Sequence, residues 1–160
     1  INRIFGNSIK STFKTTDLKT KNEGKLTGCS ALHNGYEKNF GCLHKREVYL
    51  DLDSNKLKGV DHIIKKSDGI PIRYVFRFHL SPELTAVKTM SGNSALIQLS
   101  KNKSLIFTVH EDKLEIEKSI YLGGKKILDN TCITISGNLV NKSKSFNWEI
   151  KKKIDNEFKN

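Results

Sequence analysis

The sequence predicts an all-β fold, an antiparallel β-sandwich of about ten or more strands with little or no helix. Apolar and polar residues alternate along many short segments, as expected for strands with one buried face. Turn-forming residues separate these segments at intervals of about 8 to 12 residues, a spacing typical of sandwiches and barrels. Nothing in the first 140 residues shows a sustained helical period.

The clearest strand lies at residues 72–80, where Ile72, Tyr74, Phe76, Phe78 and Leu80 alternate with Arg73, Arg77 and His79. We expect the aromatic set to pack in the core, because its strict alternation fits a buried strand face better than a stacking surface for nucleic acid. Trp148 is likewise expected in the core or at a contact between domains.

The remaining strands follow in order along the chain. The predicted strands are 12–19, 25–33, 48–52, 57–64, 84–90, 95–99, 105–109, 114–121, 127–135 and 146–150. The predicted turns are 34–35, 53–55, 67–69, 91–93, 101–103 and 123–124. Asn34 and Gly35 favour a type I′ hairpin, since both residues tolerate positive φ. Pro71 stands at a strand start, where its missing N–H costs least.

The chain of 160 residues is long enough for one domain, which we expect to span residues 1–154 with a polar tail at 155–160. Its 36% hydrophobic and 28% charged residues exclude a disordered or membrane-spanning composition. No apolar run reaches the roughly 18 residues of a spanning helix. Residues 1–10 lack the apolar block of a signal peptide.

The net charge of +11 favours anionic partners such as acidic polysaccharide, nucleic acid or a membrane surface. Most of the excess is lysine spread along the chain, so a solvated outer face accounts for most of it.

Cys29, Cys42 and Cys132 cannot all pair, and we expect buried free thiols rather than a zinc site. A bond between Cys29 and Cys42 stays open.

From His33 onward, an ordered set of short motifs resembles the C-terminal β-sandwich of the heparinase II/III-like polysaccharide lyases. The motifs are His33-Asn34-Gly35-Tyr36, Phe40-Gly41, His44-Lys45-Arg46-Glu47, Leu57-Lys58-Gly59-Val60-Asp61, Arg77-Phe78-His79-Leu80-Ser81-Pro82, Tyr121-Leu122-Gly123-Gly124 and Trp148. Each motif alone arises readily by chance, whereas their order and separations together are specific.

The resemblance implies a larger protein in which an N-terminal helical toroid packs against this β region and the active site lies between them. Such lyases cleave uronate-containing polysaccharides by β-elimination, which needs a base, a group that neutralises the carboxylate, and an acid. It also implies a periplasmic or secreted parent, and a metal such as zinc bound upstream by a His-x-His segment.

This chain departs from that pattern, because it has no His-x-His and no toroid. We therefore expect no metal ligands and no elimination activity in this polypeptide alone. His33 and Tyr36 are the candidate base and acid, since both residue types do this work in lyases. A strand ending in a tight turn is the favoured interpretation of these two residues.

A second candidate site is a glycan-binding face. Arg73, Arg77 and His79 share a strand face, and two guanidiniums with an imidazole suit the sulfate and carboxylate groups of a glycan. Arg46 and its neighbour Lys45 suit the same ligands. A solvated or cross-strand-paired outer face is the favoured alternative for all of them.

Asp51, Asp53 and Asp61 suggest a calcium site, but the loop glycine and terminal bidentate acid of such a site are absent, so turn chemistry explains these residues.

Three functional hypotheses remain. The leading hypothesis is a lyase C-terminal domain that supports the toroid and orients acidic glycan. The alternatives are an autonomous module that binds anionic polysaccharide and a basic nucleic-acid-binding domain, the latter disfavoured by the absence of an RNP or zinc motif. A lyase domain should expose an apolar patch where the toroid docks.

Overall fold

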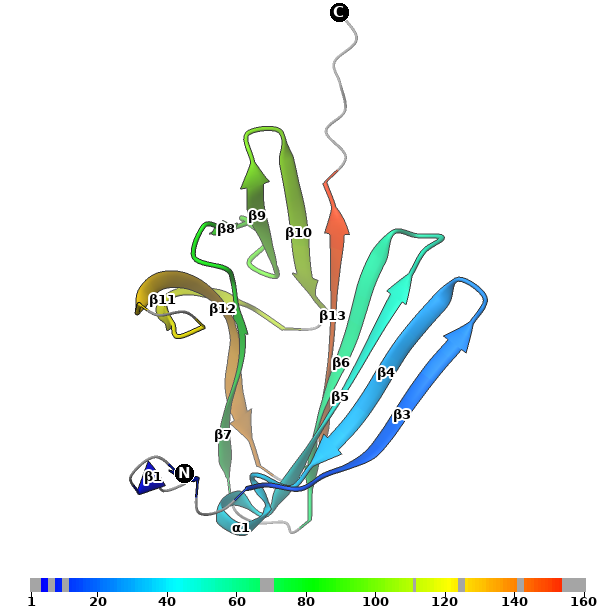
Figure 1. Ribbon diagram of the computed structural model, residues 1–160, viewed down its shortest axis with the longest axis vertical. Coiled ribbons are helices and arrows are strands. Elements are labelled where there is room, and N and C mark those ends of the chain that lie inside the picture. Colours follow the sequence, from blue (N-terminus) through cyan, green and yellow to red (C-terminus); the bar gives the residue numbers. More distant parts are fainter. Residues whose placement is uncertain are drawn as a thin grey trace, which may run out of the picture.

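The computed structural model describes residues 4–5, 8–9, 12–66, 71–110, 112–123, 126–140 and 143–153, and within them it is almost entirely antiparallel β structure (Figure 1). The strands are β1 (Ile4–Phe5), β2 (Ser8–Ile9), β3 (Thr15–Glu23), β4 (Leu26–His33), β5 (Cys42–Asp51), β6 (Lys56–Lys65), β7 (Ile72–His79), β8 (Thr85–Lys88), β9 (Ser94–Ser100), β10 (Lys103–Val109), β11 (Glu115–Tyr121), β12 (Leu128–Leu139) and β13 (Lys144–Lys152). A short helix, α1 (Glu37–Phe40), joins β4 to β5. The predicted all-β class is confirmed.

Two sheets form the sandwich. The large sheet has eight strands in the order β3-β4-β5-β6-β13-β10-β9-β8, and the small sheet has three in the order β11-β12-β7. Consecutive strands pair as hairpins from β3 to β6, whereas β13 returns from the end of the chain to lie between β6 and β10. This late insertion brings the C-terminal strand into the centre of the large sheet (Figure 1).

The core lies between the small sheet and the middle of the large sheet. On β7 the alternation works as predicted, with Ile72, Tyr74 and Phe76 at most 9% exposed. Phe146 packs against Tyr74 and Phe76 with its ring inclined to both, and the ring centroids are 4.8 Å apart in each pair. Burying large side chains like these stabilises the fold by about 1.5 to 3 kcal/mol each.

Trp148 is 5% exposed, which confirms its predicted place in the core. The indole lies directly over Gly59 on β6, its cross-strand partner. A Cβ atom at Gly59 would overlap the indole ring, so this position requires glycine for close approach.

The predicted two-residue hairpin at Asn34 and Gly35 is wrong. Neither residue has a positive φ, and the connection continues through α1 to Gly41, whose φ of 60° ends the helix. Asn34 Oδ1 accepts the Lys14 N–H at 2.8 Å, and the Asn34 carbonyl accepts the Glu37 N–H at 3.0 Å. These bonds hold Asn34 as the start of a helical turn instead of a type I′ turn.

Other boundaries differ from those expected. β5 begins at Cys42, before the predicted start at residue 48, and β12 continues to Leu139. The predicted turn at 67–69 and the tail at 155–160 lie outside the described residues. Among the described residues, no helix is long and apolar enough to cross a membrane.

Candidate functional site

Asp61 is the centre of a buried polar network. It lies on β6, is 0% exposed, and accepts four hydrogen bonds from three side chains. Arg46 on β5 donates from Nε at 2.7 Å and from Nη2 at 3.0 Å. Trp148 Nε1 donates at 2.9 Å and His44 Nε2 lies 2.7 Å away. Burial alone would raise the pKa of Asp61, but these hydrogen bonds and the Arg46 charge outweigh it and lower the pKa.

Two histidines extend the network from Asp61 to the surface. His44 Nδ1 lies 2.9 Å from His33 Nε2, and His33 Nδ1 accepts the Gly35 N–H at 3.2 Å. The direction of these bonds assigns one tautomer to each ring: Nε2–H of His33 donates to His44, and Nε2–H of His44 donates to Asp61. Burial, followed by the His44 and Arg46 charges, lowers the pKa of His33.

This chain of bonds uses every ring nitrogen of the two histidines. His33 can accept a proton at Nδ1 only by giving up the bond from Gly35, so in this conformation the imidazole holds the turn. Tyr36 lies beside it, with ring centroids 5.3 Å apart, and is 49% exposed. The structure thus brings the candidate pair of His33 and Tyr36 together at the surface.

Exposed aromatic side chains surround His33. Phe13 is 53% exposed and its ring centroid lies 5.2 Å from that of His33. Phe40 is 53% exposed and lies 6.3 Å from Tyr36. We call Phe13, Tyr36 and Phe40 the aromatic patch.

A groove of about 340 Å³ runs from the aromatic patch along the side of the sandwich. Tyr36 and Phe40 line one end, His44 lies on β5, and Tyr74 and Phe76 lie on β7. The His44 and Phe76 ring centroids are 5.6 Å apart, so the two sheets meet at this point.

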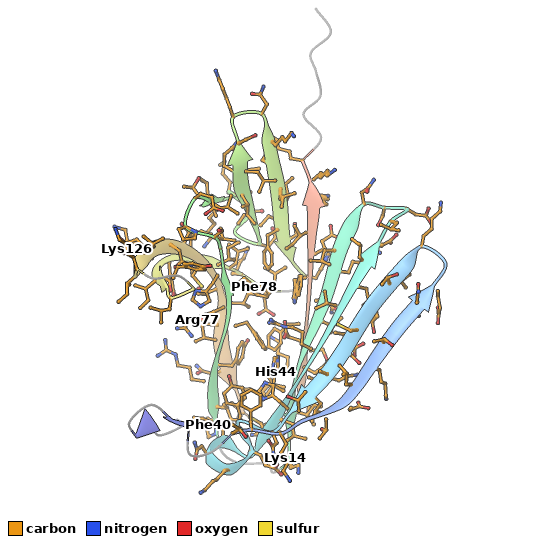
Figure 2. The ribbon with its side chains drawn as sticks, viewed as in Figure 1. Lys14, Phe40, His44, Arg77, Phe78 and Lys126 are labelled. Atoms are coloured by element: carbon orange, nitrogen blue, oxygen red, sulfur yellow. The ribbon has the colours of Figure 1, made fainter. Side chains whose placement is uncertain are left out.

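Arg73, Arg77 and His79 lie exposed on the outer face of β7, as predicted. Figure 2 shows Arg77 on the outer side of the strand and Phe78 on the side that faces the large sheet. Neither guanidinium forms an ion pair or side-chain hydrogen bond with the residues that the structure describes. His79 Nδ1 lies 3.3 Å from Ser119 Oγ. Two uncommitted cations on one strand face can bind an anionic ligand.

Arg46, on β5, does not share this face with Arg73 and Arg77. Its guanidinium is held by Asp61 and lies over the Phe78 ring, 5.3 Å from the centroid. Lys45, on the opposite face of β5, pairs with Glu47 at 2.8 Å. The Lys45 hydrogen bond, with bonds from Tyr49 and His62, lowers the pKa of Glu47 to about 2.

Sequence reasoning missed His44 and Asp61 as partners, and it assigned Asp61 to turn chemistry, which is wrong. The sequence did contain an indication of this. Every second residue of β6 faces the core, and Asp61 belongs to the same series as Leu57, Gly59 and Ile63, so its side chain is expected to point inward. Asp51 does support a turn, since its Oδ1 accepts the N–H groups of Asp53 and Ser54.

The donor set of the network does not fit a metal. N–H groups of Arg46 and Trp148 occupy Asp61, and among the described residues no group of three His, Cys, Asp or Glu side chains could hold an ion. All three cysteines are free: Cys42 and Cys132 are buried as expected, whereas Cys29 is exposed, contrary to expectation.

The geometry defines the chain as a two-sheet β-sandwich with a buried Asp-His-His network that reaches the surface. Comparison with protein families gives a match to heparinase II/III-like, C-terminal, over residues 6–149. The chain therefore belongs to the heparinase II/III-like C-terminal family.

Solved structures agree in fold. The heparan sulfate lyase HepC from Pedobacter heparinus is 13% identical with a TM-score of 0.74 over 90% of this chain, and a crystal structure of heparinase III is 18% identical with a TM-score of 0.63 over 92%. A heparinase III with methylated lysines gives a TM-score of 0.68 at 12% identity over 89%. The chain spans 22% of the length of each of these structures. No curated protein matches the chain.

Proposed function

We propose that this chain is the C-terminal β-sandwich of a polysaccharide lyase, which supports a helical catalytic toroid and helps to bind acidic, uronate-containing glycan. The aromatic patch is the observation that carries the supporting role. Its three rings are about half exposed and are connected through the His33 ring, which is unusual for the surface of an autonomous module and typical of an interaction site. The chemistry, and any zinc, would belong to the upstream part of the protein.

The glycan-binding role rests on Arg73 and Arg77. Both side chains are exposed and extend from the same strand face, and residues four apart on a strand are separated by about 13 Å. Two guanidiniums at that spacing would contact acidic groups on non-adjacent sugars of one polysaccharide chain.

The supporting role is tested by comparing this chain with the full-length lyase that would contain it. Unsaturated-uronate absorbance is measured with heparan sulfate, alginate and other acidic glycans. We expect turnover by the full-length protein and none by residues 1–160. Turnover by residues 1–160 alone would instead assign chemistry to His33 and Tyr36.

The binding role is tested with Arg73→Ala/Arg77→Ala in residues 1–160, titrated with heparan sulfate at constant salt. Losing two charge-assisted contacts should weaken binding about tenfold or more. The control is Lys101→Ala/Lys103→Ala, which removes two exposed charges at the far end of β9 and β10. An equal loss of affinity in the control would mean that net charge alone explains the binding, and it would contradict a specific binding face on β7.

The alternative of an autonomous binding module predicts a different pair of results. The chain would bind glycan, but it would not associate with a separately produced toroid. Tyr36→Ser/Phe40→Ser would then have no effect on the association measured in a mixture of the two. In a supporting domain, the same double change should weaken association with the toroid.

A further inference from the structure

The two sheets of the sandwich have four edge strands, and three of them carry features that prevent further pairing. β3 contains a bulge at Asp17, where φ is 52°, and this bulge interrupts its register between Thr16 and Lys19. β8 is four residues long and contacts β11, the edge strand of the small sheet that faces it. The sandwich is therefore closed on the β8 and β11 side.

β7 is different. It is eight residues long, and its register with β12 runs without interruption from Ile72 to His79. Pro71 precedes the strand and leaves every amide within it available for pairing. Among the described residues, no strand pairs with the second edge of β7.

The free backbone groups of that edge can be assigned. Leu80 N donates to the Thr131 carbonyl at 2.9 Å, which makes Leu80 and Thr131 a hydrogen-bonded pair. Because such pairs alternate along antiparallel strands, Tyr74 and Phe76 bond to β12. The N–H and C=O groups of Arg73, Val75 and Arg77 therefore point away from β12, and all three residues line the groove.

The large sheet is also uncovered next to this edge. β7 packs against β5, because the Phe76 ring contacts His44. β4 and β3 follow β5 in the large sheet and lie past the free edge of β7 (Figure 1). On the inner face there, Cys29 is exposed, Leu50 is 43% exposed, and Ala31 and Val48 are only partly buried. An eight-stranded sheet is covered by only three strands, so a strand added to β7 would bury this face.

We propose that the free edge of β7 pairs with an extended β-strand from the polypeptide that precedes this domain in its parent protein. The added strand fills the groove, accepts and donates the backbone bonds of Arg73, Val75 and Arg77, and packs apolar side chains over Ala31, Val48 and Leu50. The Arg73 and Arg77 side chains stay on the outer face. This inference rests on the proposed function, since it needs a longer lyase-like chain.

A second copy of this chain fits the edge less well. Two β7 strands paired antiparallel about Val75 would place Arg73 directly opposite Arg77 twice. Like charges in directly opposite positions destabilise a pair of strands.

Hydrogen exchange tests the proposal residue by residue. In residues 1–160, the amides of Val75 and Arg77 should exchange fast, while those of Tyr74 and Phe76 stay protected by β12. In the full-length protein, exchange at Val75 and Arg77 should slow by at least about 100-fold. Equal exchange rates in the two proteins would overturn the proposal.

Val75→Pro gives an independent test, with Val75→Ala as the matched control. Proline removes an amide that faces solvent in residues 1–160 but is bonded in the parent protein. Relative to alanine, proline should lower the melting temperature of the full-length protein more than that of residues 1–160. An equal effect in both would contradict the added strand.

Two further results separate this proposal from others. Protection of Val75 and Arg77 in residues 1–160 that rises with protein concentration, together with a dimer in sedimentation, would assign the edge to a second copy and overturn the proposal. A full-length protein with a protected edge and no lyase activity would support the added strand and refute only the proposed function.

Discussion

Replacing Asp61 by asparagine tests whether the buried network holds together the centre of the large sheet and the β4–β5 connection. Asp61 on β6 accepts bonds from Arg46 and His44 on β5 and from Trp148 on β13. Asparagine keeps the volume but offers one acceptor oxygen and one NH₂ group. Whichever way the amide lies, its NH₂ faces at least one N–H donor, so the network cannot be satisfied.

The expected cost follows from the burial of the carboxylate. Removing one partner of a buried ion pair typically destabilises a protein by about 3 to 5 kcal/mol, because a buried charge loses its partner. Asp61 is 0% exposed, but the Arg46 side chain is 39% exposed and can regain some water. We therefore expect a loss of about 3 kcal/mol, a large share of the roughly 5 to 15 kcal/mol typical of a domain.

Urea unfolding at neutral pH measures this loss, with the slope of the free energy against urea unchanged. The matched control is Asp53→Asn. Asp53 is 68% exposed and pairs with Lys25 at the surface, so its replacement should cost less than about 0.5 kcal/mol. A loss below about 1 kcal/mol for Asp61→Asn, or an equal loss for both variants, would refute the structural role of the network.

Three other predictions follow from the same structure. Gly59→Ala should destabilise the domain by about 1 to 3 kcal/mol or more in urea unfolding, because its Cβ overlaps the Trp148 indole. The pKa of His33 is lowered in the folded state, so the unfolded chain binds more protons below about pH 6.5 and the urea midpoint should fall as pH falls. His33→Gln should flatten that fall, and an unchanged pH profile would contradict it. Cys29 should react with a thiol reagent in the folded protein, whereas Cys42 should react only on unfolding, since Cys42 is buried and burial raises its pKa.

The fold class was predictable because one-sided burial leaves a period of two in each strand. Ile72 to Leu80 show it without interruption, and the exposed positions of Arg73 and Arg77 follow from the same alternation. The family resemblance was predictable as well, since its motifs stand in order along the chain.

The β4–β5 connection was not predictable from its local residues. Asn34 and Gly35 have the composition of a tight hairpin, but Lys14, twenty residues away in sequence, binds the Asn34 side chain and directs the backbone into α1. A contact that is distant in sequence decided a local conformation.

The candidate site divides in the same way. The sequence determined the strands and their buried faces. It also determined on which face of its strand each histidine, arginine and aspartate lies. Only the tertiary structure decided that β5, β6 and β13 are neighbours, and therefore that His44, Arg46 and Trp148 converge on Asp61. It alone also decided that β7 is an edge strand, because strand order depends on packing between segments far apart in the chain, which a period of two does not encode.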